Sequence, residues 1–214
     1  MNLRIPQFVL FDLDGTLLDS LPGIAFSVKY ACRTVGLPEP DVDLKSLLGP
    51  PIRIILSRAI PTEDALLLDR LEAAFRSSYD TEGWQKTTCF QGAYATLEAM
   101  KSNGHRLFVV SNKPLHISLR ILDRESLLPF FEKIYTLQSR FPPYTSKAEM
   151  LKSFLSEYKI PSSDCLMVGD TVEDINASAA THISLAMMEH GYGQAPSDAT
   201  VRFRLRSFSD FGLI

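Results

Sequence analysis

The chain has 214 residues, which is enough for one domain of ordinary size with a smaller insertion. Apolar residues make up 45% of it, so the chain can bury a core and is not disordered as a whole. Its formal net charge is −3, and no block of basic residues argues for a nucleic-acid partner. No apolar run approaches the ~18–20 residues that a membrane span needs.

Two further features indicate a cytoplasmic protein. The three cysteines, Cys32, Cys89 and Cys165, are far apart and form neither a disulfide framework nor a zinc-binding pattern. The apolar run near the N-terminus leads directly into acidic residues, so we expect no separate signal peptide. Reduced thiols and a cytoplasmic location are the expectation that follows.

The first predicted element is a short strand at residues 8–11, an apolar run typical of a fully buried strand. Two carboxylates, Asp12 and Asp14, come next, and Gly15 and Thr16 follow them. Because residues i and i+2 of an extended chain point to the same side, both carboxylates can face one point. Two like charges so close favour a cation between them, or one protonated group. A plain Asp-Gly turn is the alternative, and it leaves the other carboxylate unexplained.

A run of predicted helices follows this strand. Ser20 begins the first of them, and Gly36 ends it. Further helices are predicted at residues 43–48, 52–59 and 63–78. Since these helices lie between one strand and the next, we interpret residues 18–86 as an inserted all-helical cap subdomain. Residues 1–17 and 87–214 would then form the catalytic core.

The remainder of the chain alternates between strands and helices. Strands are predicted at residues 105–110, 133–137, 165–168 and 183–187. Helices are predicted at residues 93–102, 115–122, 146–158 and 172–180. The tail, residues 201–214, is expected to form a short strand or loop and a final helical turn. Such alternation predicts an α/β fold with a Rossmann-like parallel sheet core covered on both faces.

Polar side chains also follow two of the later strands. Ser111 and Asn112 end one strand, whereas Asp170 ends another and Asp174 lies four residues further on. In an open parallel sheet, ligands bind outside the carboxyl ends of the strands, so these groups are expected to meet the first acidic pair. Oxygen ligands without His or Cys point to Mg²⁺ rather than zinc. The alternative is a helix cap at Asp170 with a surface ion pair.

An anion site is predicted beside this metal site. The hydroxyl of Ser111 and the free N–H groups at the start of helix 115–122 can bind an anion together. Lys147 begins a helix, where positive charge is unfavourable unless an anion lies nearby. Lys113 and Lys152 are alternatives for the same role. A carboxylate beside Mg²⁺ and such a site can attack phosphorus, while a second carboxylate transfers protons, which is the chemistry of phosphate monoester hydrolysis.

The order and spacing of these motifs resemble the haloacid dehalogenase superfamily of phosphatases over nearly the whole chain. The resemblance implies that Asp12 is the nucleophile and Asp14 the general acid and base. It also implies Mg²⁺ bound by Asp12, by the Asp14 backbone carbonyl and by Asp170, with Asp174 in support. The matching segments are Asp12-Leu13-Asp14-Gly15-Thr16, Val109-Val110-Ser111-Asn112, Lys147, and Gly169-Asp170-Thr171 with Asp174.

The resemblance extends to the phosphate site and to the cap. It implies that Ser111, Asn112 and Lys147 bind phosphate. The helical insertion resembles the small cap of the phosphoglycolate phosphatase-like branch, which closes over the site and helps to select the substrate. Residues 48–53 resemble its Gly-centred specificity loop. The candidates for substrate specificity are therefore Thr16, Gly49 and Arg53, although an exposed Arg53 unrelated to substrate is an alternative.

Three positions depart from the family pattern or have no assigned chemistry. Lys147 follows Pro-Pro-Tyr-Thr-Ser instead of a Lys-Pro-rich stretch. Thr181-His182 stands where the family commonly has Ala-Gly, and we expect His182 to be a surface turn residue. Residues 190–193 resemble the Gly-Tyr-Gly loop of the family, which is expected near the site.

These observations predict a Mg²⁺-dependent phosphate monoester hydrolase that acts on a small phosphoglycolate-like metabolite through an aspartyl phosphate. The protein is expected to be a monomer or homodimer without a nucleic-acid or membrane partner. Dehalogenation and phosphonate cleavage need no second acid, so Asp14 argues against both. A pyrophosphatase or a phosphomutase keeps both aspartates and stays an alternative. A non-catalytic binding module is the alternative from another class, and the presence of every reactive position counts against it.

Overall fold

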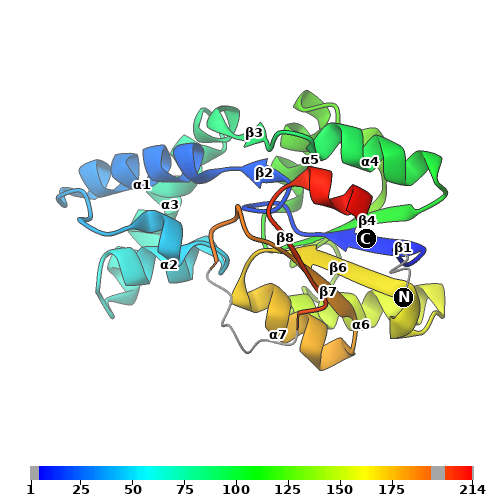
Figure 1. Ribbon diagram of the computed structural model, residues 1–214. Helices are drawn as coiled ribbons and strands as arrows, with labels where there is room; N and C mark the ends of the chain where they lie inside the picture. The colour runs from blue at the N-terminus through cyan, green and yellow to red at the C-terminus, as the bar shows by residue number, and fades with distance from the viewer. Residues whose placement is uncertain (1–4, 194–200, 214) are drawn as a thin grey trace.

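The computed structural model describes residues 5–193 and 201–213. Six strands form one parallel sheet in the order β5-β4-β1-β6-β7-β8, with β1 near its centre (Figure 1). This arrangement confirms the predicted α/β fold. The strands are β1 (Phe8–Phe11), β4 (Arg106–Ser111), β5 (Phe131–Thr136), β6 (Cys165–Gly169), β7 (Ser184–Met188) and β8 (Phe203–Leu205).

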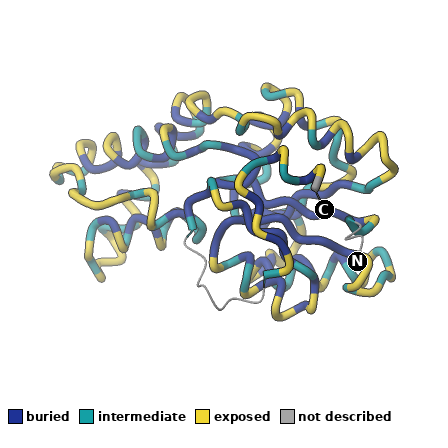
Figure 2. The backbone as a smooth tube through the Cα atoms, in the orientation of Figure 1, coloured by how far each residue is buried: buried dark blue, intermediate teal, exposed yellow. Residues whose placement is uncertain are grey.

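Helices cover both faces of the sheet, which explains why the central strand β1 is apolar at every position. Alternate residues of β1 enter different clusters: Val9 and Phe11 pack on the side of α4 and α5, while Phe8 and Leu10 pack on the side of α6 and α7. Figure 2 shows the buried sheet between more exposed helices. The four helices are α4 (Ala93–Ser102), α5 (Leu115–Arg124), α6 (Lys147–Tyr158) and α7 (Val172–Thr181).

A group of helices lies beside the sheet and follows β1 in the chain (Figure 1). Of these helices, α1 and α2 both pack against α3, and all three contribute to the larger apolar cluster of the core. A two-stranded antiparallel ribbon joins them to the sheet: β2 (Leu18–Asp19) pairs with β3 (Thr88–Cys89). The helices are α1 (Leu21–Val35), α2 (Ile52–Ala59) and α3 (Ala65–Tyr79), with short 3₁₀ turns at Leu44–Leu47 and Gly83–Lys86.

We keep a cap of residues 18–86 as a proposal, with one difference from its predicted all-helical character. Leu18–Asp19 lies inside that range and forms a strand whose partner lies just outside it. A two-residue strand carries no periodic pattern, so only the contact with its distant partner defines it. The predicted helix at 43–48 is a single 3₁₀ turn, Leu44–Leu47.

Other boundaries differ by a few residues. Helix α3 begins at Ala65 because the Asp64 carboxylate accepts hydrogen bonds from the backbone N–H groups of Leu66 and Leu67, at 2.9 and 3.2 Å. Strand β5 begins at Phe131, two residues before the predicted start. The tail contains β8 and a 3₁₀ segment at Phe208–Leu213, as predicted for its described part.

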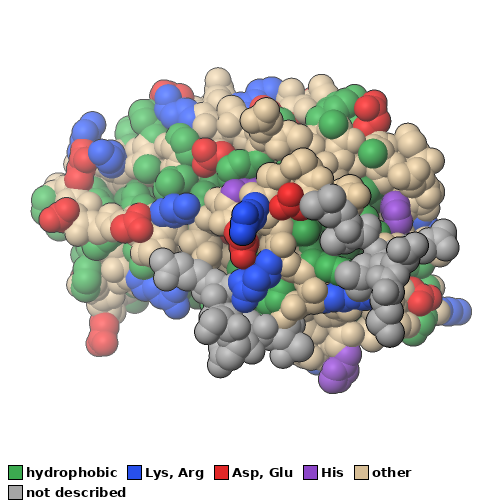
Figure 3. Space-filling model, viewed as in Figure 1, with side chains coloured by type: hydrophobic (Ala, Val, Ile, Leu, Met, Phe, Trp, Pro, Cys, Tyr) green, Lys and Arg blue, Asp and Glu red, His purple; other side chains and the backbone are tan. Residues whose placement is uncertain are grey.

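The distribution of surface charge and the state of the cysteines are as the sequence predicted. On the face drawn in Figure 3, acidic and basic side chains are interspersed among other groups. All three cysteines are free thiols. Within residues 5–193 and 201–213, no helix is both long enough and apolar enough to span a bilayer.

Candidate active site

Three neighbouring strands bring the polar residues of distant motifs to one edge of the sheet. Because β4, β1 and β6 are adjacent, their carboxyl ends lie side by side. Asp12 directly follows β1, Ser111 ends β4, and Asp170 directly follows β6. All three side chains are buried. The parallel register therefore assembles a polar site from positions far apart in the sequence.

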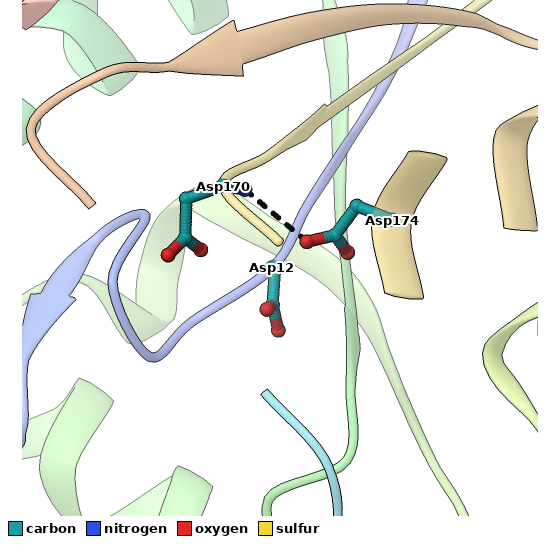
Figure 4. Close-up of side chains that lie close together, drawn as sticks. All are labelled: Asp12, Asp170 and Asp174. Carbon is teal, nitrogen blue, oxygen red and sulfur yellow. Dashed lines mark hydrogen bonds between the residues drawn. The ribbon is translucent and has the colours of Figure 1, made fainter. Parts of the chain in front are cut away.

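A group of buried carboxylates forms the centre of this site. Asp12, Asp170 and Asp174 each offer an oxygen atom, and these atoms all lie within 4.8 Å of one another. Figure 4 shows the three side chains, which extend from the ends of β1 and β6 and from the first turn of α7. Asp14 does not belong to this group, and its carboxylate contacts a lysine instead.

Asp174 shapes the loop that carries Asp170. Its Oδ2 accepts hydrogen bonds from the backbone N–H groups of Asp170 and Thr171 at 3.1 and 3.0 Å, and from the Thr171 hydroxyl at 2.8 Å. Its other oxygen accepts a hydrogen bond from the Lys147 ammonium group at 2.7 Å. These bonds fix the turn between β6 and α7, so Asp174 supports the site chiefly by orienting its neighbours.

The Asp170 carboxylate is oriented by two donors. The Thr16 hydroxyl donates to Oδ1 at 2.9 Å, and the Tyr192 backbone N–H donates to Oδ2 at 2.7 Å. Glycines allow this close packing, because a Cβ atom at Gly15 or at Gly191 would collide with the Asp170 side chain. Thr16 is fully buried and does not line the cavity of the site, and its contact is with Asp170, a candidate metal ligand.

Lys147 lies between two of the carboxylates. Its Nζ is 2.6 Å from Asp12 Oδ2 and 2.7 Å from Asp174 Oδ1, and its side chain is only 3% exposed. Burial alone would lower the pKa of Lys147, but the two carboxylates hold it above its ordinary value. Lys152, on the same helix, is exposed. Of the three candidate lysines, Lys147 is thus the one that contacts Asp12.

The cluster of Asp12, Asp170 and Asp174 holds more carboxylates than nearby basic groups, because Lys147 is the ammonium group that contacts it. Burial raises the pKa of Asp170 to about 8, with Asp174 and Asp12 adding to the effect. Burial, Asp174 and Asp14 raise the pKa of Asp12 to about 6, although Lys147 opposes this. Asp12 Oδ1 is also buried and has no hydrogen-bond partner among the described residues. Three carboxylate oxygens could act as metal ligands here, and Asp12 Oδ1 has no hydrogen-bond partner in the described part of the chain. Such a set of oxygen ligands fits a hard divalent cation such as Mg²⁺.

Asp14 has a separate partner, Lys113. The Lys113 ammonium group lies 2.9 and 3.1 Å from the two carboxylate oxygens of Asp14, and it also donates to the Tyr79 hydroxyl at 2.7 Å. Burial alone would lower the pKa of Lys113, but Asp14 and Tyr79 hold it above its ordinary value. Tyr79 belongs to α3, so this contact connects the helical segment to the sheet.

A cavity of about 160 Å³ opens above the site between the sheet edge and the helical segment. Asp12, Asp14, Ser111 and Asn112 line its lower part. The side-chain amide of Asn112 donates to the Gly49 backbone carbonyl at 3.0 Å, which ties the predicted specificity loop to the end of β4. Ser111 accepts a hydrogen bond from the Lys113 backbone N–H at 3.3 Å.

Arg53 lies outside this cavity. Its guanidinium group is 2.6 Å from Asp69 and 3.4 Å from Glu72, both on α3. The predicted contact between Arg53 and substrate therefore has no support from this arrangement. Arg76, which lies on α3 and not on α2 with Arg53, does line the cavity. The sequence offered no signal for this difference, because which arginine of the helical segment faces inward depends on how its helices pack.

Tyr192 was the least predictable residue of the site. Its hydroxyl accepts hydrogen bonds from the backbone N–H groups of Ser20 and Leu21 at 2.7 and 3.0 Å, and donates to Asp19 at 2.8 Å. The sequence placed the Gly-Tyr-Gly loop near the site without a role. The structure shows that Tyr192 links the start of α1 to Asp170. His182, as predicted, is an exposed turn residue at the end of α7.

A model of the haloacid dehalogenase-like hydrolase family matches residues 9–188 of this chain. The chain belongs to the haloacid dehalogenase-like hydrolase family. The resemblance inferred from the motifs is thereby confirmed, and this hydrolase shares its fold with solved members of the family. One is a haloacid dehalogenase-like protein from Streptococcus pneumoniae, with a TM-score of 0.87 and 22% identity over 98% of this chain and 97% of that chain.

Several curated proteins are similar to this hydrolase in sequence. The tyrosine-protein kinase PtkA of Mycobacterium tuberculosis is 33% identical over 191 residues, which cover 89% of this chain and 64% of that protein. A 5'-nucleotidase of Pseudomonas aeruginosa is 29% identical over 192 residues, covering 89% of this chain and 86% of that protein. A phosphoglycolate phosphatase of Aliivibrio fischeri is 28% identical over 207 residues, covering 90% and 89%.

Proposed function

We propose that this hydrolase cleaves phosphate monoesters of small metabolites through an aspartyl phosphate on Asp12. The observation that supports this most is the position of Asp12, which faces the cavity with one oxygen paired to Lys147 and the other unpaired. A buried carboxylate held in this way is a nucleophile with nearby positive charge.

The first chemical step transfers the phosphoryl group to the protein. A carboxylate oxygen of Asp12 forms a bond to phosphorus while the bond between phosphorus and the ester oxygen breaks. Asp14, which also lines the cavity, gives a proton to the departing alcohol. Lys147 and the Ser111 hydroxyl would hold the non-bridging oxygens, and Lys113 keeps the Asp14 carboxylate in position.

The second step releases phosphate. Asp14 takes a proton from a water molecule, whose oxygen attacks the phosphorus of the aspartyl phosphate. The bond between phosphorus and Asp12 then breaks, and the carboxylate is restored. Asp14 thus returns to the protonation state that the first step requires, so one residue serves as acid and then as base.

Mg²⁺ fits the site as a cofactor. Asp12, Asp170 and the Asp14 backbone carbonyl would hold the ion, with Asp174 orienting the Asp170 loop. The bound ion would neutralise charge on the phosphate oxygens. This assignment explains why three carboxylates can be buried together with a single ammonium group.

Transfer to an acceptor other than water is a second candidate, and the similarity to PtkA favours it. That relative is named a tyrosine-protein kinase, and this chain covers 64% of its length. A pyrophosphatase and a phosphomutase would also retain the two aspartates. If these activities used Asp12 as the nucleophile, each would share the first step and would differ in the acceptor that removes the phosphoryl group from Asp12.

The test is turnover of p-nitrophenyl phosphate with and without Mg²⁺. We expect Asp12→Asn to abolish turnover, since the amide is not a nucleophile. Asp123→Asn is the matched control, because Asp123 is exposed on α5 and lies outside the cavity. Unchanged turnover in Asp12→Asn would reject the proposed nucleophile. Release of inorganic phosphate distinguishes hydrolysis from transfer to another acceptor.

A further inference from the structure

The residues that line the cavity limit which leaving alcohol a substrate can have. The strand ends supply the polar part of the lining, where the phosphate would bind. The residues of the helical segment that line the cavity are mostly apolar. The apolar ones include Ile24, Leu48, Ile52, Ile55 and Phe75. The Phe75 ring also stacks on the ring of Tyr79, with centroids 5.2 Å apart, so the wall contains a flat aromatic surface.

The cations that line this cavity already have partners. Among the described residues, only Lys113 and Arg76 bring a basic side chain to its lining. The Lys113 ammonium group contacts Asp14 and the Tyr79 hydroxyl. Arg76 lies 3.6 Å from Glu72, which also lines the cavity. A second negative group on the substrate would therefore meet Glu72 and find no unpaired cation in this lining.

The charged residues that the structure describes around Glu72 supply no unpaired cation either. Glu72 is shared with Arg53 at 3.4 Å, and Arg53 is held more closely by Asp69 at 2.6 Å. Arg53 and Asp69 do not line the cavity, so the ion pair that faces it is Glu72 with Arg76. An anionic leaving group would approach the Glu72 carboxylate and compete with it for Arg76, so this part of the cavity disfavours such a group.

We propose that the leaving alcohol of the substrate is uncharged and presents an apolar, preferably aromatic, face to Phe75 and the isoleucines. This inference rests on the proposed function and narrows its substrate class. It departs from the phosphoglycolate-like expectation, because phosphoglycolate carries a second carboxylate. Apolar contact would favour the apolar ester, while the Glu72 carboxylate excludes the anionic one.

Two esters with similar leaving-group chemistry test the proposal. Benzyl phosphate has an apolar alcohol, and phosphoglycolate has an anionic one. We expect kcat/KM for benzyl phosphate to exceed that for phosphoglycolate at least about tenfold. Non-hydrolysable benzylphosphonate and phosphonoacetate should show the same order as competitive inhibitors, or as ligands in a direct binding measurement.

Glu72→Gln tests the role of this carboxylate directly. The ratio of kcat/KM for the two esters is compared between the variant and the parent, so the intrinsic reactivity of each ester cancels. The substitution leaves Arg76 without its carboxylate partner. We expect the ratio of kcat/KM for phosphoglycolate to kcat/KM for benzyl phosphate to rise about tenfold. Glu63→Gln is the matched control, since Glu63 is exposed and lies outside the cavity, and it should leave the ratio unchanged.

Phe75→Leu tests the apolar wall from the opposite direction. It keeps most of the side-chain volume and removes the flat ring, so benzyl phosphate should lose several-fold in kcat/KM. A cooperative urea unfolding transition shows that this variant is folded.

The outcomes separate this inference from the proposed function. Hydrolysis of both esters with phosphoglycolate preferred would overturn the inference and leave the hydrolase activity standing. A ratio that Glu72→Gln does not change would overturn it as well. Hydrolysis of neither ester would contradict the proposed function, and the two phosphonates would then still decide which alcohol body the cavity accepts.

Discussion

At the scale of single residues, the site depends on where one ammonium group lies. Lys147 contacts Asp12 and Asp174, and it is the one basic group that reaches the three-carboxylate cluster in the described residues. The aspartates could be predicted from the sequence, because two of them follow a buried strand and a third follows another. The residues alone left Lys113 and Lys152 as alternatives to Lys147, and the family resemblance pointed to Lys147.

Lys147→Met is expected to lower kcat by at least about 100-fold, because the transferred phosphoryl group loses a positive partner. In Mg²⁺-free buffer it should also lower the free energy of unfolding by about 3–5 kcal/mol, since two buried carboxylates lose their cation. Steady-state kinetics and urea unfolding measure the two effects. Lys152→Met, exposed on the same helix, is the control. Near-normal kcat in Lys147→Met would contradict its assigned role.

Asp14→Asn should separate the two chemical steps. With p-nitrophenyl phosphate, whose leaving group needs little protonation, transfer to Asp12 can continue. Release of phosphate then lacks its base and should slow by about 10²–10⁴-fold. Stopped-flow absorbance is expected to show a burst of p-nitrophenol followed by slow turnover. Equal slowing of both phases, with no burst, would count against Asp14 as the base of the second step.

At the scale of elements, the loop after β7 connects two parts of the molecule. Tyr192 binds Asp170 through its backbone N–H and the start of α1 through its hydroxyl. Helices and strands with clear periodicity, such as α2, could be predicted residue for residue. The two-residue strand β2 could not, and neither could the role of Tyr192, because both depend on contacts across more than 65 residues of sequence.

Tyr192→Phe tests this connection, since it removes the hydroxyl and keeps the ring and the backbone N–H. The hydroxyl takes part in three hydrogen bonds, two of them with backbone N–H groups that would lose their partner. We expect the free energy of unfolding to fall by about 1–3 kcal/mol. Urea unfolding measures it, with Tyr30→Phe on the exposed side of α1 as control. Equal stability of both variants would mean that the hydroxyl does not tie the loop to α1.

At the scale of the whole molecule, the fold could be predicted because the strands are apolar and alternate with helices. The sheet order then places the ends of β1, β4 and β6 together without further information. How the helical segment lies on the sheet edge could not be predicted in the same way. Its packing places Arg53 outside the cavity and Arg76 at its wall, which one sequence without helix-packing information does not specify.

Mg²⁺ should stabilise the whole molecule through the carboxylate cluster. At about 100 times its Kd, the ion is expected to add about 2.7 kcal/mol to the free energy of unfolding. Asp170→Asn should abolish this gain. In Mg²⁺-free buffer the variant should be no less stable than the parent, because burial and its carboxylate neighbours already disfavour the charged form of Asp170. Thermal unfolding with Mg²⁺ and with EDTA measures both, with Asp123→Asn as control. A full Mg²⁺ gain in Asp170→Asn would place the ion elsewhere.

The most direct test of the account is to find the phosphoryl group on Asp12 during turnover. The enzyme would be mixed with labelled phosphate ester and Mg²⁺, quenched in acid within one turnover, and mapped by peptide mass spectrometry. We expect label on the peptide that contains Asp12, more of it in Asp14→Asn, and none in Asp12→Asn. Turnover without label on that peptide, or label on another residue, would contradict Asp12 as the nucleophile.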